Sequence, residues 1–156
     1  MLQPDDRRTS MIIWGALVAG VSMFYAVVVF VIPPLEGSVG PELADTLLLV
    51  AAALSVVTVA TSWLWVVRMR LPARPGAAPL SGPALARTRL IVACAICEGP
   101  ALFAMIVFLL SRDVRVLVPF ALSYVALLAH FPGESHWARL SGTAPEGSGP
   151  NRMIRG

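Results

Sequence analysis

Four long apolar runs, separated by polar segments, dominate the pattern of hydrophobic and polar positions along the chain. They cover residues 11–32, 43–67, 88–110 and 114–130. About 20 apolar helical residues are needed to cross the roughly 30 Å hydrocarbon core of a bilayer. The first three runs reach that length, whereas the fourth has only 17 residues and contains Pro119. We therefore predict four transmembrane helices, the last of which depends on its neighbour.

The connections between the runs predict how the helices are paired and oriented. Residues 111–113 form a three-residue turn, so the last two runs should make an antiparallel hairpin, and the first two runs should make another. Only two of the twelve arginines, Arg112 and Arg115, lie at that turn, and the loop between the first two runs has none. The other ten lie toward the opposite ends of the runs, on the same side as both termini. Cytoplasmic loops carry the excess of basic residues. We expect both termini to be cytoplasmic.

The resulting organisation is an all-α membrane protein of two antiparallel hairpins with polar segments on the cytoplasmic side. The linker and the tail are rich in Pro, Gly and small residues, so we expect the linker to be flexible and the tail to be disordered. The predicted segments are an N-terminal tail (1–10), the first hairpin (11–67), a linker (68–87), the second hairpin (88–130) and a C-terminal tail (131–156).

Composition narrows the class of protein. Hydrophobic residues make up 57% of the chain and charged residues only 13%, which is typical of a membrane protein and not of a soluble domain. The net charge of +3 is spread over the membrane-flanking segments, so nucleic acid is not an expected partner. The first apolar run exceeds the roughly 7–15 residues of a signal peptide core, so we expect an uncleaved helix. A multi-pass protein of a bacterial inner membrane is the predicted location.

The two predicted hairpins share a pattern that indicates an internal repeat. At an offset of 79 residues, five positions spaced four apart match: Ile12, Ala16, Gly20, Phe24 and Val28 with Ile91, Ala95, Gly99, Phe103 and Val107. At an offset of 68, residues 49–50, 53–55 and 57 match residues 117–118, 121–123 and 125. Both halves run in the same direction, so this pattern predicts a parallel repeat whose axis follows the membrane normal.

Glu98 is the residue that most needs a functional explanation. It is the eleventh of the 23 residues of the third run, which places its carboxyl near the middle of the membrane. A charged group at that depth costs at least about 2.5–3.5 kcal/mol on insertion scales. No Lys or Arg occurs at a comparable depth in the other runs. Glu98 is therefore expected to be protonated, to bind a proton or a cation such as Na⁺, or to face a partner outside this chain.

Several polar groups could complete a site around Glu98. Ser55, Thr58 and Tyr25 lie at middle depth and could serve as oxygen ligands. Gly99 and Pro100 predict a helix break that frees a backbone carbonyl beside the carboxyl group. Each feature also has a structural explanation, because Ser and Thr in membrane helices often bond to their own backbone and proline kinks are common there.

Cys94 and Cys97 form a C-x-x-C pair inside the same run. A redox pair of this kind depends on a helix N-terminus, and a metal site needs further ligands, so we interpret both cysteines as small packing residues. The chain contains neither a Ser-His-Asp pattern nor a phosphate-binding glycine loop. An enzyme is therefore not the expected class, and no cofactor beyond a proton or Na⁺ is predicted.

The stretch AICEGPALFAMIVFLL, residues 95–110, resembles the carboxylate-bearing helix of the proteolipid (c) subunits of rotary ATPases. The resemblance implies that Glu98 matches their ion-binding carboxylate. Residues 16–30 have the same outline, with Ala19 where the Glu would be, as in duplicated proteolipids that keep one carboxylate per two hairpins. Proteolipids carry this carboxylate on the second helix of a hairpin, whereas Glu98 lies on the first.

Two functional hypotheses follow. In the first, the protein is a small polytopic membrane protein with a midplane proton or cation site at Glu98. In the second, it is a structural or accessory subunit, in which Glu98 is an assembly contact. Small residues four apart, such as Ala16 and Gly20, permit close helix approach and favour self-association or packing against other membrane subunits within the lipid bilayer.

Overall fold

The computed structural model describes residues 4–33, 39–64 and 82–141, all of whose regular elements are helical. The elements are α1 (Pro4–Ala26), a π-helix (Val27–Val31), α2 (Pro41–Leu64), α3 (Gly82–Ser111), a 3-10 turn (Val114–Val116), α4 (Leu117–Ala129) and α5 (Glu134–Ser141). Three helical segments are long and apolar enough to cross a membrane: Arg7–Val31, Pro41–Leu64 and Gly82–Ser111. The fourth, Val114–Ala129, is apolar but shorter.

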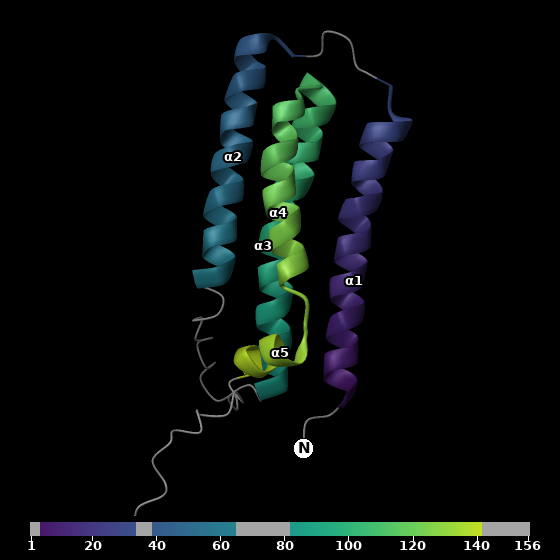
Figure 1. Ribbon diagram of the computed structural model, residues 1–156, viewed down its shortest axis with the longest axis vertical. Coiled ribbons are helices and arrows are strands. Elements are labelled where there is room, and N and C mark those ends of the chain that lie inside the picture. The colour runs from purple at the N-terminus through teal and green to yellow at the C-terminus, as the bar shows by residue number, and fades with distance from the viewer. Residues whose placement is uncertain (1–3, 34–38, 65–81, 142–156) are drawn as a thin grey trace, which may run out of the picture.

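Helix α3 lies at the centre of the bundle (Figure 1). It packs against α1, α2, α4 and α5, whereas α1 and α2 lie on opposite sides of the α3–α4 pair (Figure 1). Helices α1 to α4 alternate in direction (Figure 1). The start of α1 and the whole of α5 therefore lie at one end of the bundle, called here the α5 end, and the connection from α3 to α4 lies at the other, called here the turn end (Figure 1).

The central position of α3 follows from its small buried residues. Gly and Ala-sized side chains let helix backbones approach closely, which is the main source of packing energy between apolar helices in lipid. Larger side chains from α3 then fill the space that remains. The buried residues of α3 are Ala86, Leu90, Ala93, Cys94, Cys97, Pro100, Ala101, Ala104, Met105 and Val107.

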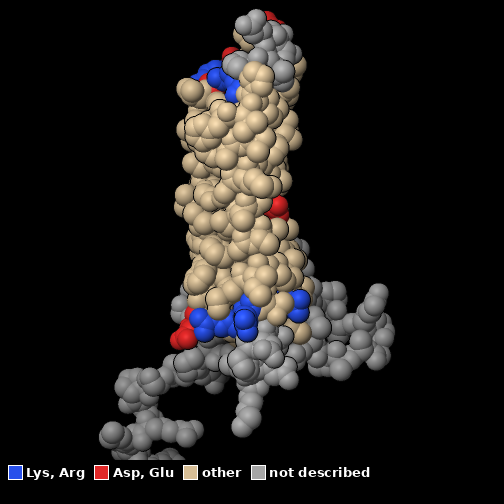
Figure 2. Space-filling model, turned by 90° about the vertical axis from the view of Figure 1, so that its right-hand side faces the viewer, with Lys and Arg blue, Asp and Glu red and all other residues tan. Residues whose placement is uncertain are grey.

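Charge is distributed as a membrane-embedded bundle requires. Figure 2 shows basic and acidic side chains gathered at the two ends, with an uncharged wall between them that is interrupted by one acidic patch near mid-height. Large apolar side chains of the bundle, such as Phe30, Leu49 and Val118, are 70–78% exposed. In water such a surface would be unfavourable, so the exposed wall supports a membrane environment.

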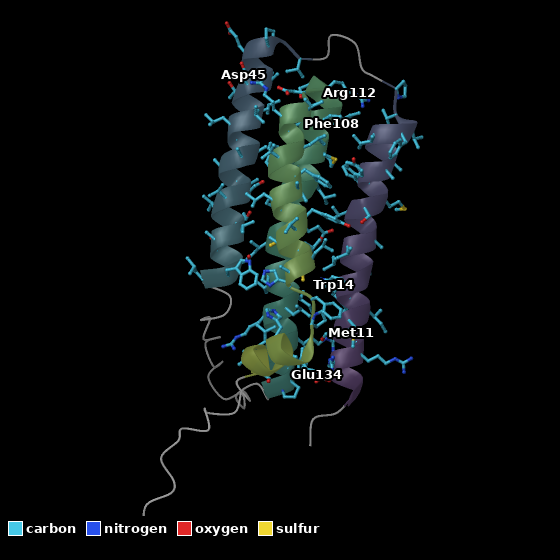
Figure 3. All side chains as sticks on the ribbon, viewed as in Figure 1. Met11, Trp14, Asp45, Phe108, Arg112 and Glu134 are labelled. Atoms are coloured by element: carbon cyan, nitrogen blue, oxygen red, sulfur yellow. The ribbon has the colours of Figure 1, made fainter. Side chains whose placement is uncertain are left out.

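Arg112 closes the end of α1 at the turn end. The β-branched run at Val27–Val31 ends α1 as a π-helix, whose wider turns leave terminal carbonyls without intrahelical partners. The Arg112 guanidinium donates to the carbonyl oxygens of Val28 (3.3 Å), Ile32 (2.9 Å) and Pro33 (3.0 Å). Figure 3 shows Arg112 and Phe108 together at this end, and the guanidinium lies 5.6 Å from the Phe108 ring centroid. The turn after α3 therefore holds α1 in place.

The two predicted hairpins are not equivalent in their packing. Helices α3 and α4 form a packed antiparallel pair, as expected from the short turn. Helices α1 and α2 are antiparallel but separated by that pair (Figure 1). The sequence pattern could not predict this separation, because it depends on α3 having more small residues on several faces than α1 has.

The predicted disordered tail contains a packed helix, α5, so the prediction of disorder is wrong for residues 134–141. In α5, Trp137 and Leu140 are 5% and 2% exposed. The Arg89 side chain donates to the Leu140 carbonyl oxygen at 2.8 Å, and Arg7 pairs with Glu134 at 3.0 Å near the α5 end (Figure 3). Apolar residues spaced three apart on a short helix explain this docking. Residues 142–156 and most of the predicted linker lie outside the described part.

Helix α3 also begins within the predicted linker, at Gly82. A Cβ atom at Gly82 would lie 2.9 Å from the Ser141 carbonyl oxygen, so this position needs glycine for α5 to approach. The boundary of the second hairpin is therefore earlier than the hydropathy pattern predicts, because a helix can extend past the apolar core through polar residues such as Arg87 and Arg89.

Candidate functional site

Glu98 lies at the edge of the exposed face of α3. At 100° per residue, Ile91, Ala95 and Gly99 share one face of this helix, and each is exposed. Cys97, one position before Glu98, is buried in the core. Glu98 itself is half-buried, between these two environments. Its carboxyl group is therefore not sealed inside the bundle.

The Glu98 carboxyl makes no hydrogen bond or ion pair with the part of the chain that the structure describes. Its neighbour one turn earlier is Cys94, whose side chain is 1% exposed. Among the described residues, no ion pair lies at the depth of Glu98, because the Arg7 and Arg115 pairs are at the two ends of the bundle. A mid-membrane carboxyl without a partner is energetically costly.

The predicted oxygen ligands on α2 are engaged with other groups. The Ser55 hydroxyl is buried and donates to the Pro119 carbonyl oxygen of α4 at 3.1 Å. The Thr58 hydroxyl bonds back to the carbonyls of Leu54 (2.7 Å) and Ser55 (3.2 Å). Ser55 thus joins α2 to α4, at a proline whose first-turn position needs no donor. These are the structural roles that hydroxyls in membrane helices commonly take.

Tyr25 faces α4. Its ring stacks on Phe120 with centroids 5.2 Å apart, and the Ser22 and Tyr124 hydroxyls form a hydrogen bond of 2.7 Å beside it. Trp14 reaches across in the same way and donates to the Leu127 carbonyl oxygen at 3.0 Å (Figure 3). Large side chains of α1 therefore fill the space between α1 and α4, and none of these contacts brings Tyr25 to Glu98.

Gly99 and Pro100 do not interrupt α3, which continues as one α-helix from Gly82 to Ser111. The predicted helix break is therefore absent. Pro100 is buried, and α3 continues past it although its nitrogen has no hydrogen to donate. A Cβ atom added at Gly99 would meet nothing within 4 Å, so this glycine leaves open space beside Glu98.

Cys94 and Cys97 are buried free thiols. In the described ranges, no group of three or more His, Cys, Asp or Glu side chains is arranged to hold a metal ion. Their burial against α2 fits the prediction that they are packing residues.

A histidine cluster at the α5 end was missed by the sequence-based prediction. His130 follows α4 directly, and its ring stacks on Trp63 of α2 at 5.0 Å and lies 5.7 Å from the His136 ring of α5. The sequence offered one signal, two histidines six positions apart across Pro132 and Gly133, which turn the chain back.

A second missed feature is the polar network at the turn end. Arg115 pairs with Asp45 at the start of α2 (2.7 Å) and with Asp113 (2.6 Å). Its hydrogen bonds hold the pKa of Asp113 below its usual range. The sequence did contain a signal for this network, because Arg112 and Arg115 lie together at the end of the bundle that has few arginines. They were used only to predict the orientation of the helices.

Comparison with known proteins found no relative of this chain. No protein family matches the chain, and searches of curated proteins and of solved structures gave no match.

Proposed function

We propose that this chain is a four-span membrane subunit that binds another transmembrane helix through the exposed face of α3, with Glu98 as the central contact. The observation that carries the proposal is the half-buried Glu98 carboxyl, which has no partner among the described residues. A mid-membrane carboxyl gains most from a basic or hydroxyl group. This chain has no Lys or Arg at that depth. The partner helix therefore supplies the complementary group.

The surface around Glu98 suits a helix. Ala95 and Gly99 are four apart, exposed and small, which lets a second backbone approach. The open space at Gly99 gives room for a side chain to reach the carboxyl group. Hydrogen bonds between membrane helices contribute about 0.6–2 kcal/mol each. Glu98 would thus add specificity to an interface whose area comes from apolar packing.

The proposal also includes the arrangement of the four membrane-spanning helices and the internal repeat. Alternating helix directions, with the start of α1 and α5 at one end, support two hairpins with both termini on the cytoplasmic side (Figure 1). The five matched positions of α1 and α3 also have matching burial: the first three of each set are exposed, the phenylalanines are half-buried and the valines are buried. This agreement favours a duplication after which α3 moved to the centre.

Native mass spectrometry after mild detergent extraction tests the subunit proposal. We expect the wild-type chain from its own host to appear in a complex of reproducible mass with a defined second membrane protein. Glu98→Ala should lower the fraction in the complex about tenfold, and Glu98→Gln should lower it less, because an amide keeps a hydrogen bond. Val118→Ala, on the exposed face of α4, is the matched control. A wild-type chain that is always alone would contradict the proposal.

A proton or Na⁺ site at Glu98 is the second candidate, and the proteolipid resemblance of residues 95–110 favours it. In that case the ligands beside Glu98 come from water, lipid or another subunit, since Ser55 and Thr58 bond elsewhere. Dicyclohexylcarbodiimide reacts with protonated carboxyls in membranes. Labelling of Glu98 that falls with added Na⁺ or with rising pH in the purified chain supports this candidate; unchanged labelling opposes it.

A further inference from the structure

The π-helix at the end of α1 leaves the carbonyl oxygen of Val28 without a backbone donor. In a π-helix each N–H donates to the oxygen five residues earlier, and the Ile32 nitrogen accordingly lies 3.0 Å from the Val27 oxygen. The residue five positions after Val28 is Pro33, which has no N–H. The Val28 oxygen therefore depends on the guanidinium of Arg112, which lies 3.3 Å from it.

An ordinary α-helical turn would satisfy the same oxygen without Arg112. In an α-helix the donor lies four residues after the acceptor, so the Ile32 N–H would move from the Val27 oxygen to the Val28 oxygen. The Val31 N–H would then donate to the Val27 oxygen. Two donors therefore compete for the Val28 oxygen, the Arg112 guanidinium in the π register and the Ile32 N–H in the α register. Short π-helical turns are rare and occur frequently at functional sites.

The sequence of this turn suits both registers. Residues 27–31 read VVVFV, so neither register turns a polar side chain toward the membrane. Val28 is buried, whereas Phe30 and Val31 are exposed. A shift of one residue would place another valine where Val28 now packs, and replacement by a side chain of the same volume is well tolerated. The choice between the registers therefore depends on Arg112 more than on apolar packing.

The backbone of Arg112 is unusual in a way that depends on its side chain. Helix α3 ends at Ser111, and Arg112 follows it with a φ of 53°, in the left-handed region. Glycine is preferred at this position after a helix, because a β-carbon is disfavoured there. The three hydrogen bonds from the Arg112 side chain to the end of α1 offset this unfavourable backbone conformation.

The bonds that hold Arg112 can be exchanged for others. Its three acceptors are neutral carbonyl oxygens, whereas two carboxylates at the turn end, Asp45 and Asp113, pair with Arg115. Hydrogen bonds between two charged groups are the stronger kind. The Nε atom of Arg112 is also buried and has no hydrogen-bond partner within the described residues, which is unfavourable. Both features lower the advantage of the bound guanidinium over a released one.

We propose that the end of α1 is a switch between two helical registers, in which Arg112 holds the π register. When the guanidinium leaves the Val28 oxygen, the last turn rewinds as an α-helix and Ile32 advances by one residue along it. Ile32 and Pro33 lead into the connection to α2, whereas Arg112 directly follows α3. The switch therefore couples the turn after α3 to the exit of the chain from α1, as a two-state element does. It does not depend on the proposed contact at Glu98.

Solid-state NMR of the full-length chain in lipid bilayers tests the switch. With isotope-labelled isoleucine nitrogen and valine carbonyl carbon, the distances from the Ile32 nitrogen to the Val27 and Val28 carbonyl carbons report the register. In the wild type we expect the Val27 carbon to be the nearer one. Arg112→Gly should make the Val28 carbon the nearer one, because glycine suits the left-handed backbone and only the side chain is removed.

Two further variants keep the test decisive. Arg115→Ala is the matched control, because Arg115 belongs to the same turn and bonds to Asp45 and Asp113, and among the described residues it makes no bond to α1. This variant should keep the Val27 carbon nearer. Arg112→Asn replaces the glycine variant if that does not fold, since asparagine also tolerates the left-handed conformation. The π register in a folded Arg112 variant, or the α register in the wild type or in Arg115→Ala, would overturn the proposal.

Discussion

Helices α1 and α3 present similar exposed ridges, but only α3 is surrounded by the rest of the bundle. Ile12, Ala16 and Gly20 of α1 are exposed in the same way as their counterparts on α3. Helix α1 reaches its neighbours through large side chains, such as Trp14 and Tyr25, whereas α3 lets them approach through small ones.

The chemical difference between the two helices lies at one matched position, where α1 has an exposed alanine, Ala19, and α3 has Glu98. Two ridges of similar shape would bind lipid or a partner helix equally well. In the proposed interface a carboxyl group would make one of them specific, because apolar lipid tails cannot satisfy it. The comparison teaches that the small-residue pattern alone does not identify an interface in this protein.

The largest expected effect comes from separating α1 from α3 at the turn end. Arg112→Ala leaves the carbonyls of Val28, Ile32 and Pro33 without their donor. Hydrogen bonds to charged groups contribute about 1.5–3 kcal/mol each, and we expect a loss of about 2–4 kcal/mol in the free energy of unfolding. Thermal unfolding in detergent measures it.

Two controls sharpen that result. Arg112→Lys keeps the charge but not the planar fork of donors, so it should recover only part of the stability. Arg115→Ala removes a more exposed arginine of the same turn and should cost clearly less stability than Arg112→Ala. Equal losses for Arg112→Ala and Arg115→Ala would show that Arg112 does not anchor α1.

An intermediate effect is expected from filling the open space at two matched glycines. Gly99→Leu blocks the approach of a helix beside Glu98, and we expect several-fold less complex in native mass spectrometry. Gly20→Leu, at the equivalent position of α1, should leave the complex unchanged. A Cβ atom at either glycine meets nothing within 4 Å, so both variants should keep wild-type unfolding temperatures. Equal loss of complex in both variants would remove the distinction between the two ridges.

The smallest effect concerns acid pH at the turn after α3, a network with no counterpart in the described part of the first loop. Hydrogen bonds from Arg115 lower the pKa of Asp113 in the folded chain. A lowered pKa stabilises the fold above the ordinary value near 4, and this contribution is lost as the pH falls through the folded value. Wild type should therefore lose slightly more stability than Asp113→Asn between about pH 5 and pH 2.5. Parallel pH curves would contradict this.

The hydrophobic pattern of the sequence was sufficient to predict the helical fold, because each long run has enough apolar residues to cross a bilayer. It could not show that α1 and α2 are separated, since that depends on which faces of α3 accept neighbours. Helix α5 was missed because Pro132 and Gly133 resemble the start of a disordered tail, although Trp137 and Leu140 carry the spacing of a docked helix. A pattern confined to one run could not pair His130 with Ser62 and His136.

Glu98 could be selected from the sequence because it is a lone charge in an apolar run. The ligands of Glu98 could not be selected in this way, because the depth of a residue in the membrane does not determine the direction in which its side chain points. Ser55, Thr58 and Tyr25 share its approximate depth but point to α4 or to their own backbone. Direction depends on the packing of all four helices, and only the structure supplies it.

Photo-crosslinking in intact membranes tests most directly whether the α3 ridge is an interface and the α1 ridge is not. A photoreactive amino acid replaces Ile91 of α3 or its match Ile12 of α1, which are 37% and 64% exposed. We predict a discrete protein adduct from position 91 that disappears when Glu98→Ala is added, and only lipid adducts from position 12. Lipid adducts alone from position 91, or the same protein adduct from both positions, would contradict the assignment of Glu98 as an assembly contact.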